Sequence, residues 1–235
     1  MFITFEGGEG SGKSTQIRLL AERLRAHGRE VFTTREPGGT PDAELVRSLL
    51  VSGDPFRWTS EEELLLVTVA RSNHLRHVIN PKLEHGVYVI CDRFVDSTYV
   101  YQSFAGTAPV EFFTEVSSRM IGNSFPNLTI VLDIDPWIGI RRSRDRMANL
   151  KMASELATSE AIQKSSMELI EIAGNLSTAA NEDRFERKQI EFHEKVRAGF
   201  IEVAKQHADR CRLLDANRPV EIIADDIWTL INGLR

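Results

Sequence analysis

The chain has 235 residues, of which 42% are hydrophobic and 27% charged, and its formal net charge is −5. These values are typical of one soluble α/β domain and argue against a disordered chain or a strongly basic nucleic-acid-binding protein. The two cysteines, Cys91 and Cys211, lack the spacing of a zinc site, and no apolar run is long enough to cross a bilayer. No targeting segment is visible, so we expect a cytoplasmic protein with no nucleic-acid or membrane partner.

Short apolar segments alternate with segments of helical periodicity along the chain. The apolar segments predict five β-strands, at residues 3–6, 31–34, 87–91, 128–133 and 212–215. The periodic segments predict helices from the first glycine-rich loop to Gly28 and at residues 61–80, 110–121, 136–147, 185–206 and 220–234. Because strands alternate with helices, we expect one α/β domain, residues 1–235, with a five-stranded parallel sheet between two helical layers.

A glycine-rich segment, GGEGSGKS at residues 7–14, follows the first predicted strand and matches the pattern G-x-x-x-x-G-K-[ST]. Glycines let several backbone N–H groups point at one anion, and the start of the next helix adds partial positive charge. Lys13 is expected to reach the β- and γ-phosphates of ATP, and Ser14 to bind Mg²⁺, a role that Thr15 could share. The segment therefore predicts a P-loop NTPase fold.

Glu9 is unusual within an anion site, because a carboxylate there needs a partner such as a substrate hydroxyl, a metal-bound water or a basic side chain. The sequence has neither the N-K-x-D segment nor the D-x-x-G switch of a GTPase, which argues against a signalling switch. A kinase of a small acceptor needs a second anion site. The candidates for it are Arg35, Arg47, Arg71 and Arg93.

Three segments together resemble the thymidylate kinase family: FEGGEGSGKST at residues 5–15, TREPGGT at 34–40 and CDRF at 91–94. The resemblance runs from residue 2 to about 146 and resumes from 183 to about 228. It implies a kinase that transfers the γ-phosphoryl group of ATP to dTMP with the help of Mg²⁺, giving dTDP and ADP. It also implies a homodimer.

The resemblance further implies which residues bind each substrate. ATP would be bound by Gly7, Gly8, Glu9, Gly10, Ser11, Gly12, Lys13, Ser14, Thr15 and Arg142. The acceptor would be bound by Glu9, Glu36, Arg47, Val67, Arg71, Arg93, Ser97, Thr98, Tyr101 and Gln102. The catalytic residues would be Lys13, Arg93, Glu9, Arg142 and Arg146, and the metal would be held by Ser14 and Asp92.

Several of these residues have distinct implied roles. Arg93 would hold the acceptor phosphate, and Arg71 would hydrogen-bond the thymine ring. Thr98 and Gln102 would read the base edge, because a pyrimidine needs both donors and acceptors and a guanidinium with a carboxamide supplies them. Tyr101 would crowd the sugar 2′ position and so favour deoxyribose.

Neither Gly8 nor Gly10 is basic, so the resemblance implies that a lid at about 140–187 supplies the catalytic arginine. Arg142, Arg144 and Arg146 lie before an insertion at about 148–181, and Arg184 follows it. We expect the insertion to form one or two surface helices or a partly mobile segment, on a lid that still closes over ATP. The alternative is that the insertion prevents the lid from closing over ATP.

Three alternatives remain open from the sequence. Val67 stands where the family stacks a phenylalanine on thymine, which predicts weaker dTMP binding unless another residue such as Phe104 fills the gap. The protein could instead phosphorylate another nucleotide or a nucleoside. It could also be a non-catalytic nucleotide-binding protein whose lid docks a partner.

Overall fold

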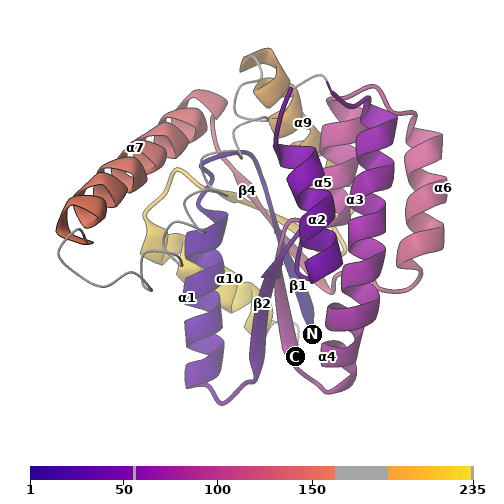
Figure 1. Ribbon diagram of the computed structural model, residues 1–235. Coiled ribbons are helices and arrows are strands. Elements are labelled where there is room, and N and C mark those ends of the chain that lie inside the picture. Colours follow the sequence, from indigo (N-terminus) through magenta and orange to yellow (C-terminus); the bar gives the residue numbers. More distant parts are fainter. Residues whose placement is uncertain (55–56, 162–189, 234–235) are drawn as a thin grey trace.

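A computed structural model describes residues 1–54, 57–161 and 190–233, without the side chains of 150–161. One sheet of five parallel strands lies at its centre, in the order β2-β3-β1-β4-β5 (Figure 1). The strands are β1 (Phe2–Glu6), β2 (Val31–Arg35), β3 (Tyr88–Asp92), β4 (Leu128–Asp133) and β5 (Cys211–Asp215). All five strands predicted from the sequence are confirmed, to within one residue at each end.

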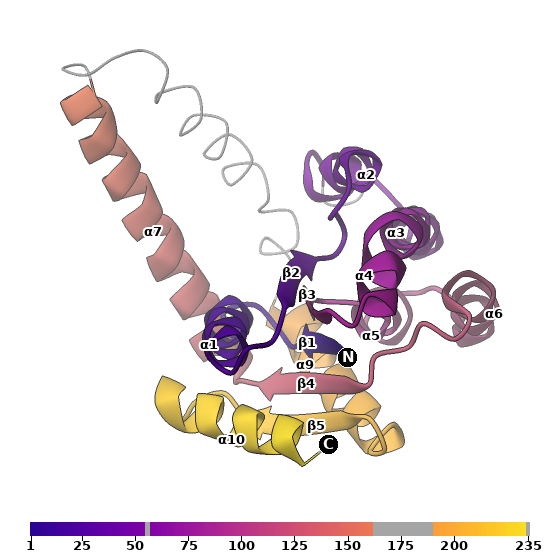
Figure 2. The ribbon, with the colours of Figure 1, turned by 90° about the horizontal axis from the view of Figure 1, so that it is seen from below.

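Helices cover both faces of the sheet, as the view from below shows (Figure 2). One face packs against α1 (Lys13–Ala26) and α10 (Val220–Asn232). The other face packs against α3 (Ser60–His74), α6 (Val110–Ile121), α9 (Ile190–Gln206) and the shorter helices described below. The predicted three-layer α/β/α class is therefore confirmed.

The alternation of side chains along β1 explains why both faces need cover. Ile3 and Phe5 point into the cluster that contains Leu20 and Leu24 of α1, whereas Phe2 points to the opposite face and meets Phe94 edge-on at 5.0 Å. All six side chains are at most 4% exposed. A strand that is apolar on both sides is stable only between two helical layers.

The predicted end of the helix at residues 61–80 is wrong. After α3 the chain continues through a π-helical turn, η1 (Leu75–Ile79), directly into α4 (Asn80–Glu84). Pro81 lies in the first turn of α4, where the missing N–H breaks no intrahelical hydrogen bond. The proline therefore begins a helical segment here and does not end one.

The predicted end of the helix at residues 136–147 is also wrong, because α7 runs over Pro136–Ala161 and leads away from the sheet (Figure 2). Residues 148–161 include four alanines, two leucines and two glutamates and have no glycine or proline to stop a helix. The rest of the expected insertion, Arg184 and the start of the helix expected at 185–206 lie outside the described residues. Among those that are described, no helix has the length and apolarity that a membrane crossing requires.

Two helical segments were not given bounds by the sequence analysis. The first is α2 (Pro41–Val51), which begins after an N-cap at Thr40, whose hydroxyl accepts a hydrogen bond from the Ala43 amide at 3.1 Å. The second is α5 (Val95–Thr98), which passes into a π-helix, η2 (Tyr99–Phe104). Both segments contribute walls to the cavity described next.

Candidate active site

A cavity of about 430 Å³ lies at the carboxyl ends of β2 and β3, beside the glycine-rich loop. Most of the residues expected to bind substrate or metal line it. They are Glu9, Gly10, Ser11, Gly12, Lys13, Ser14, Thr15, Glu36, Arg47, Val67, Arg71, Asp92, Arg93, Ser97, Thr98, Tyr101, Gln102 and Arg146. Of the expected site residues, Gly7, Gly8 and Arg142 are not in the lining. The carboxyl ends of parallel strands are where open α/β sheets bind ligands.

The glycine-rich loop is held close to α7. Gly10 has φ 64°, and a Cβ there would lie 2.0 Å from the carbonyl oxygen of Gly139, so only glycine fits. Lys13 folds over the loop and donates to the carbonyl oxygens of Gly7 at 3.1 Å and Gly8 at 3.0 Å. Burial, and then the nearby charge of Arg93, lower the pKa of Lys13 to about 8. The negative charge of a bound polyanion would favour the protonated form of Lys13 and so counteract this lowering of its pKa.

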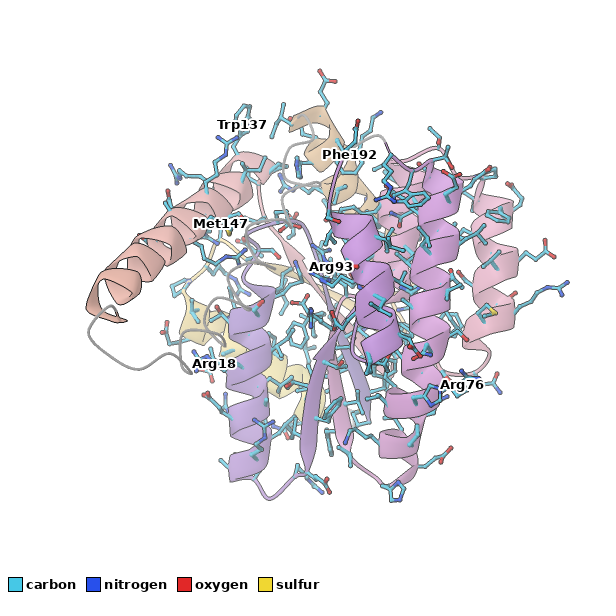
Figure 3. All side chains as sticks on the ribbon, in the orientation of Figure 1. Arg18, Arg76, Arg93, Trp137, Met147 and Phe192 are labelled. Carbon is cyan, nitrogen blue, oxygen red and sulfur yellow. The ribbon has the colours of Figure 1, made fainter. Side chains whose placement is uncertain are left out.

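Arg93 lies between the glycine-rich loop and α5 on the wall of the cavity, and it is central in the molecule (Figure 3). Its backbone has φ 66°, the only positive value for a non-glycine residue in the described part of the chain. The guanidinium donates to Glu9 Oε1 at 3.0 Å, to the Gly7 carbonyl at 3.1 Å and to Ser97 Oγ at 3.2 Å. Strained backbone of this kind is common where a side chain must be aimed at a ligand.

Glu9 therefore has a basic side chain as its partner, one of the three possibilities left by the sequence. Burial alone would raise the pKa of Glu9, but the positive charges of Arg93 and Lys13 outweigh burial and hold it below the usual range. The carboxylate is ionised at neutral pH. It orients Arg93 from the opposite side of the site.

Ser14 and Asp92 are the two residues expected to hold a metal ion. Ser14 Oγ lies 3.4 Å from Asp92 Oδ2, at the edge of hydrogen-bonding distance. Asp92 Oδ1 is buried and has no hydrogen-bond partner among the described residues. A hydroxyl beside a carboxylate that has an unsatisfied oxygen is a donor set that suits Mg²⁺ with retained waters.

The far end of the cavity is a buried polar network around Arg71. Its Nε donates to Glu36 Oε2 at 2.7 Å and its Nη2 donates to Thr98 Oγ1 at 2.9 Å. His74 Nδ1 lies 3.1 Å from the other oxygen of Glu36. The guanidinium also stacks 5.0 Å from the centre of the Phe94 ring. Arg71 is thus held in one orientation before any ligand binds.

The arginines of α7 occupy different surroundings. Arg146 lines the cavity and its charge contributes to the low pKa of Glu9. Arg142 instead points to the loop between β5 and α10, where it donates to the Ala216 carbonyl at 3.1 Å and to Asn217 Oδ1 at 3.2 Å. The two arginines can therefore serve different parts of a nucleotide.

Phe104 does not line the cavity, so it does not fill the space beside Val67. It is 39% exposed and packs near Tyr99, with ring centres 6.2 Å apart. Val67 itself borders the cavity and is half-buried. The acceptor end accordingly has an aliphatic side chain at this position.

Comparisons with known proteins show the family of the chain. The sequence model described as thymidylate kinase matches residues 5–181. A thymidylate kinase of Caulobacter vibrioides is 40% identical, covering 98% of this chain and 95% of its own length. The chain belongs to the thymidylate kinase family. A relative in the same family from Ruegeria pomeroyi is also 40% identical, over 98% of this chain and 94% of its own.

A solved structure supports membership of this family. The crystal structure of thymidylate kinase from Ehrlichia chaffeensis aligns with a TM-score of 0.69, at 28% identity, over 99% of this chain and 98% of its own. The fold is thus shared over nearly the whole length of both chains.

Buried carboxylates that support the site were missed by the sequence analysis. Glu6, at the end of β1, accepts hydrogen bonds from the Phe94 amide at 2.7 Å and from Ser97 Oγ at 2.5 Å. Burial, and then the charge of Asp96, raise the pKa of Glu6 to about 7. Asp96 in turn receives two hydrogen bonds from Arg210, at 2.7 and 2.8 Å. Only the position of Glu6, a charged residue closing a buried strand, could have signalled such a role.

Proposed function

We propose that the protein transfers the γ-phosphoryl group of ATP to the 5′-phosphate of dTMP, giving dTDP and ADP. The contact of Arg93 with Glu9 carries this proposal, because it joins the phosphate loop to an arginine on the acceptor side of one cavity. Two anions can then be held facing each other. Membership of the thymidylate kinase family supports the same reaction.

Catalysis in this proposal rests on positioning and on neutralising charge. The acceptor phosphate is already an anion, so no strong general base is needed. Lys13 and Arg93 hold the donor and acceptor phosphates from opposite sides, and Arg146 adds positive charge from the lid. Fixed positive charges of this kind stabilise the charge that develops on a transferring phosphoryl group.

Ser14 and Asp92 would hold Mg²⁺ in the same arrangement. When bound, the ion neutralises charge on the donor phosphates. Asp92 contributes further by placing Arg93, the next residue, at the end of β3.

At the acceptor end, Arg71, Thr98 and Gln102 face the base, while Tyr101 stands beside the sugar. Tyr101 lies close to Arg93, whose guanidinium is 5.1 Å from the ring centre. Glu36 holds Arg71, and Arg47 donates to the Pro37 carbonyl at 3.0 Å in the segment that follows β2. Thymine and phosphate would thus meet separate groups within one cavity.

The lid and the quaternary structure complete the proposal. We assign the lid to about 140–187 of a single kinase domain, with Arg142 at the ATP side.

We also propose a cytoplasmic location and a homodimer. The homodimer is proposed because α2 and α3, which pack together, expose several large apolar side chains. These are Leu45, Leu49, Leu65 and Val69. Light scattering on the purified chain measures the expected doubled mass, and a monomer at micromolar concentration would contradict it.

The direct test is a panel of nucleoside monophosphates with ATP and Mg²⁺. We expect dTMP to have the highest kcat/KM and the Lys13→Ala variant to lose at least about 10³-fold in kcat. Turnover of another monophosphate well above dTMP would assign a different acceptor. ATP binding without turnover of any monophosphate would instead support a non-catalytic protein.

A further inference from the structure

Glu63 is a buried acid that the reaction described above does not use. It lies in the first turn of α3 and is 4% exposed, whereas Glu61 and Glu62 beside it are exposed. The N-terminus of α3 is capped by Thr59 and Glu62, so Glu63 is not needed there. A buried carboxylate is costly unless donors satisfy it, and one of its donors is Gln102, whose Nε2 lies 3.0 Å from Glu63 Oε2.

This hydrogen bond fixes which way the Gln102 amide points. Glu63 Oε2 accepts this hydrogen bond from the amide nitrogen, so the amide oxygen of Gln102 is turned away from Glu63. Gln102 lines the cavity, whereas Glu63 is not among the described residues that do so. The planar amide therefore turns its Oε1 toward the cavity. Within the described part of the chain, no donor bonds to that oxygen.

Arg71 provides the opposite kind of group on the same wall. Its Nε and Nη2 are oriented by Glu36 and Thr98, and a guanidinium has only donors to offer. The base end of the cavity thus presents a fixed acceptor from Gln102 beside fixed donors from Arg71. Because all these side chains are at most 4% exposed, neither group can turn freely into solvent.

We propose that Glu63 is a specificity-determining residue, which holds Gln102 in the orientation that accepts a hydrogen bond from a thymine-type base. Thymine has an N3–H donor next to the acceptor O4, which complements this pattern. Cytosine reverses both groups, with an acceptor at N3 and an amino group at C4. The inference rests on the proposed function, and it adds a carboxylate that acts through Gln102 without contacting the base.

The test compares dTMP with 5-methyl-dCMP, which keeps the methyl group and differs only at the two hydrogen-bonding positions. In Glu63→Gln, the new amide can donate or accept, so Gln102 can adopt either orientation. We expect the ratio of kcat/KM for dTMP to that for 5-methyl-dCMP to fall by about tenfold or more relative to the wild type. A ratio within twofold of wild type in a folded variant would overturn the proposal.

A double variant distinguishes this role from a merely structural one. In Glu63→Gln combined with Gln102→Glu, the carboxylate at position 102 accepts from the amide at position 63 and again presents an acceptor to the cavity. We expect the preference for dTMP to return to within about threefold of wild type. A double variant that remains unselective would show that Glu63 does not act through the orientation of position 102.

One measurement needs no variant, in case Glu63→Gln does not fold. In the wild-type chain without substrate, the Gln102 side-chain amide protons should exchange slowly with solvent when followed by NMR, and fast exchange would overturn the proposal. A wild type that uses dTMP and 5-methyl-dCMP equally would defeat the inference while leaving the kinase activity standing. A wild type that uses no pyrimidine monophosphate would defeat the proposed function, and this inference with it.

Discussion

The acceptor end of the cavity and the α7 arginines differ in how their cationic and polar groups are held. At the acceptor end, a buried carboxylate holds each key group: Glu36 binds Arg71, Glu63 binds Gln102 and Glu6 binds Ser97. On α7, by contrast, Arg142, Arg144 and Arg146 are exposed. The fold thus fixes the groups that would select the acceptor, whereas the groups that would stabilise the transferring phosphoryl lie on a helix that leads away from the sheet.

This difference predicts that lid substitutions change rate more than binding or stability. Arg146→Ala should lower kcat by about 10³-fold, because the lost guanidinium would neutralise charge mainly in the transition state. KM for dTMP should change little, and steady-state kinetics with both substrates varied measures the two separately. The matched control is Arg144→Ala, which removes an exposed arginine of the same helix that does not line the cavity. Equal losses in both variants would remove the distinction between these arginines.

Substitutions at the acceptor end should change the stability of the protein. Glu36→Ala leaves Arg71 buried without its carboxylate, so the free energy of unfolding should fall by about 3–5 kcal/mol in chemical denaturation. Arg142→Ala, which removes exposed contacts, should change it by less than about 1 kcal/mol. If the two variants were equally stable, the acceptor network would not contribute to folding as we describe.

The lowered pKa of Lys13, in the glycine-rich loop between these two regions, predicts that activity depends on pH. Its pKa is lowered to about 8, and the protonated form is the one that attracts phosphate. The kcat/KM for ATP should therefore be level just below pH 8 and fall about tenfold per pH unit above it. If Lys13 had the ordinary lysine pKa of 10.5, this fall would begin only near pH 10.5. A level profile between pH 7.5 and 10 would contradict the shifted pKa.

The smallest expected effect concerns the aliphatic wall of the acceptor end. Val67→Phe places an aromatic ring beside the base, where stacking is worth about 1–3 kcal/mol in nucleic-acid complexes. KM for dTMP should fall by about five- to tenfold with kcat unchanged, as initial rates at saturating ATP would show. The Val67→Leu variant serves as a control for added volume without an aromatic face.

The sequence predicted the fold because each strand is a short apolar run and most of the segments between the strands have helical periodicity. Most of the cavity lining was predicted through the family resemblance that three motifs carry. The sequence did not predict Glu6, Glu63 or His74, because nothing in their local sequence distinguishes a buried acid or histidine from a solvated one. Glu63 and its partner Gln102 are 39 residues apart in the sequence, and Glu6 and its partner Ser97 are 91 residues apart. Only the folded chain brings these pairs together.

The helix ends that were predicted wrongly have a similar cause. Pro81 follows a π-helical turn, and a proline at the first turn of a new helix looks the same in sequence as one that ends a helix. The extension of α7 beyond residue 147 follows from helix-forming composition alone, without the apolar stripe that marks a packed helix.

Binding of dTMP in the absence of any nucleotide tests the central claim most directly, namely that the acceptor end is formed before the lid acts. Isothermal titration should give the same Kd for dTMP with the wild type and with Arg146→Ala, although the variant has lost turnover. If the wild type bound dTMP only after ATP was added, or if Arg146→Ala lost dTMP binding together with turnover, the acceptor end would depend on the lid and the account would be contradicted.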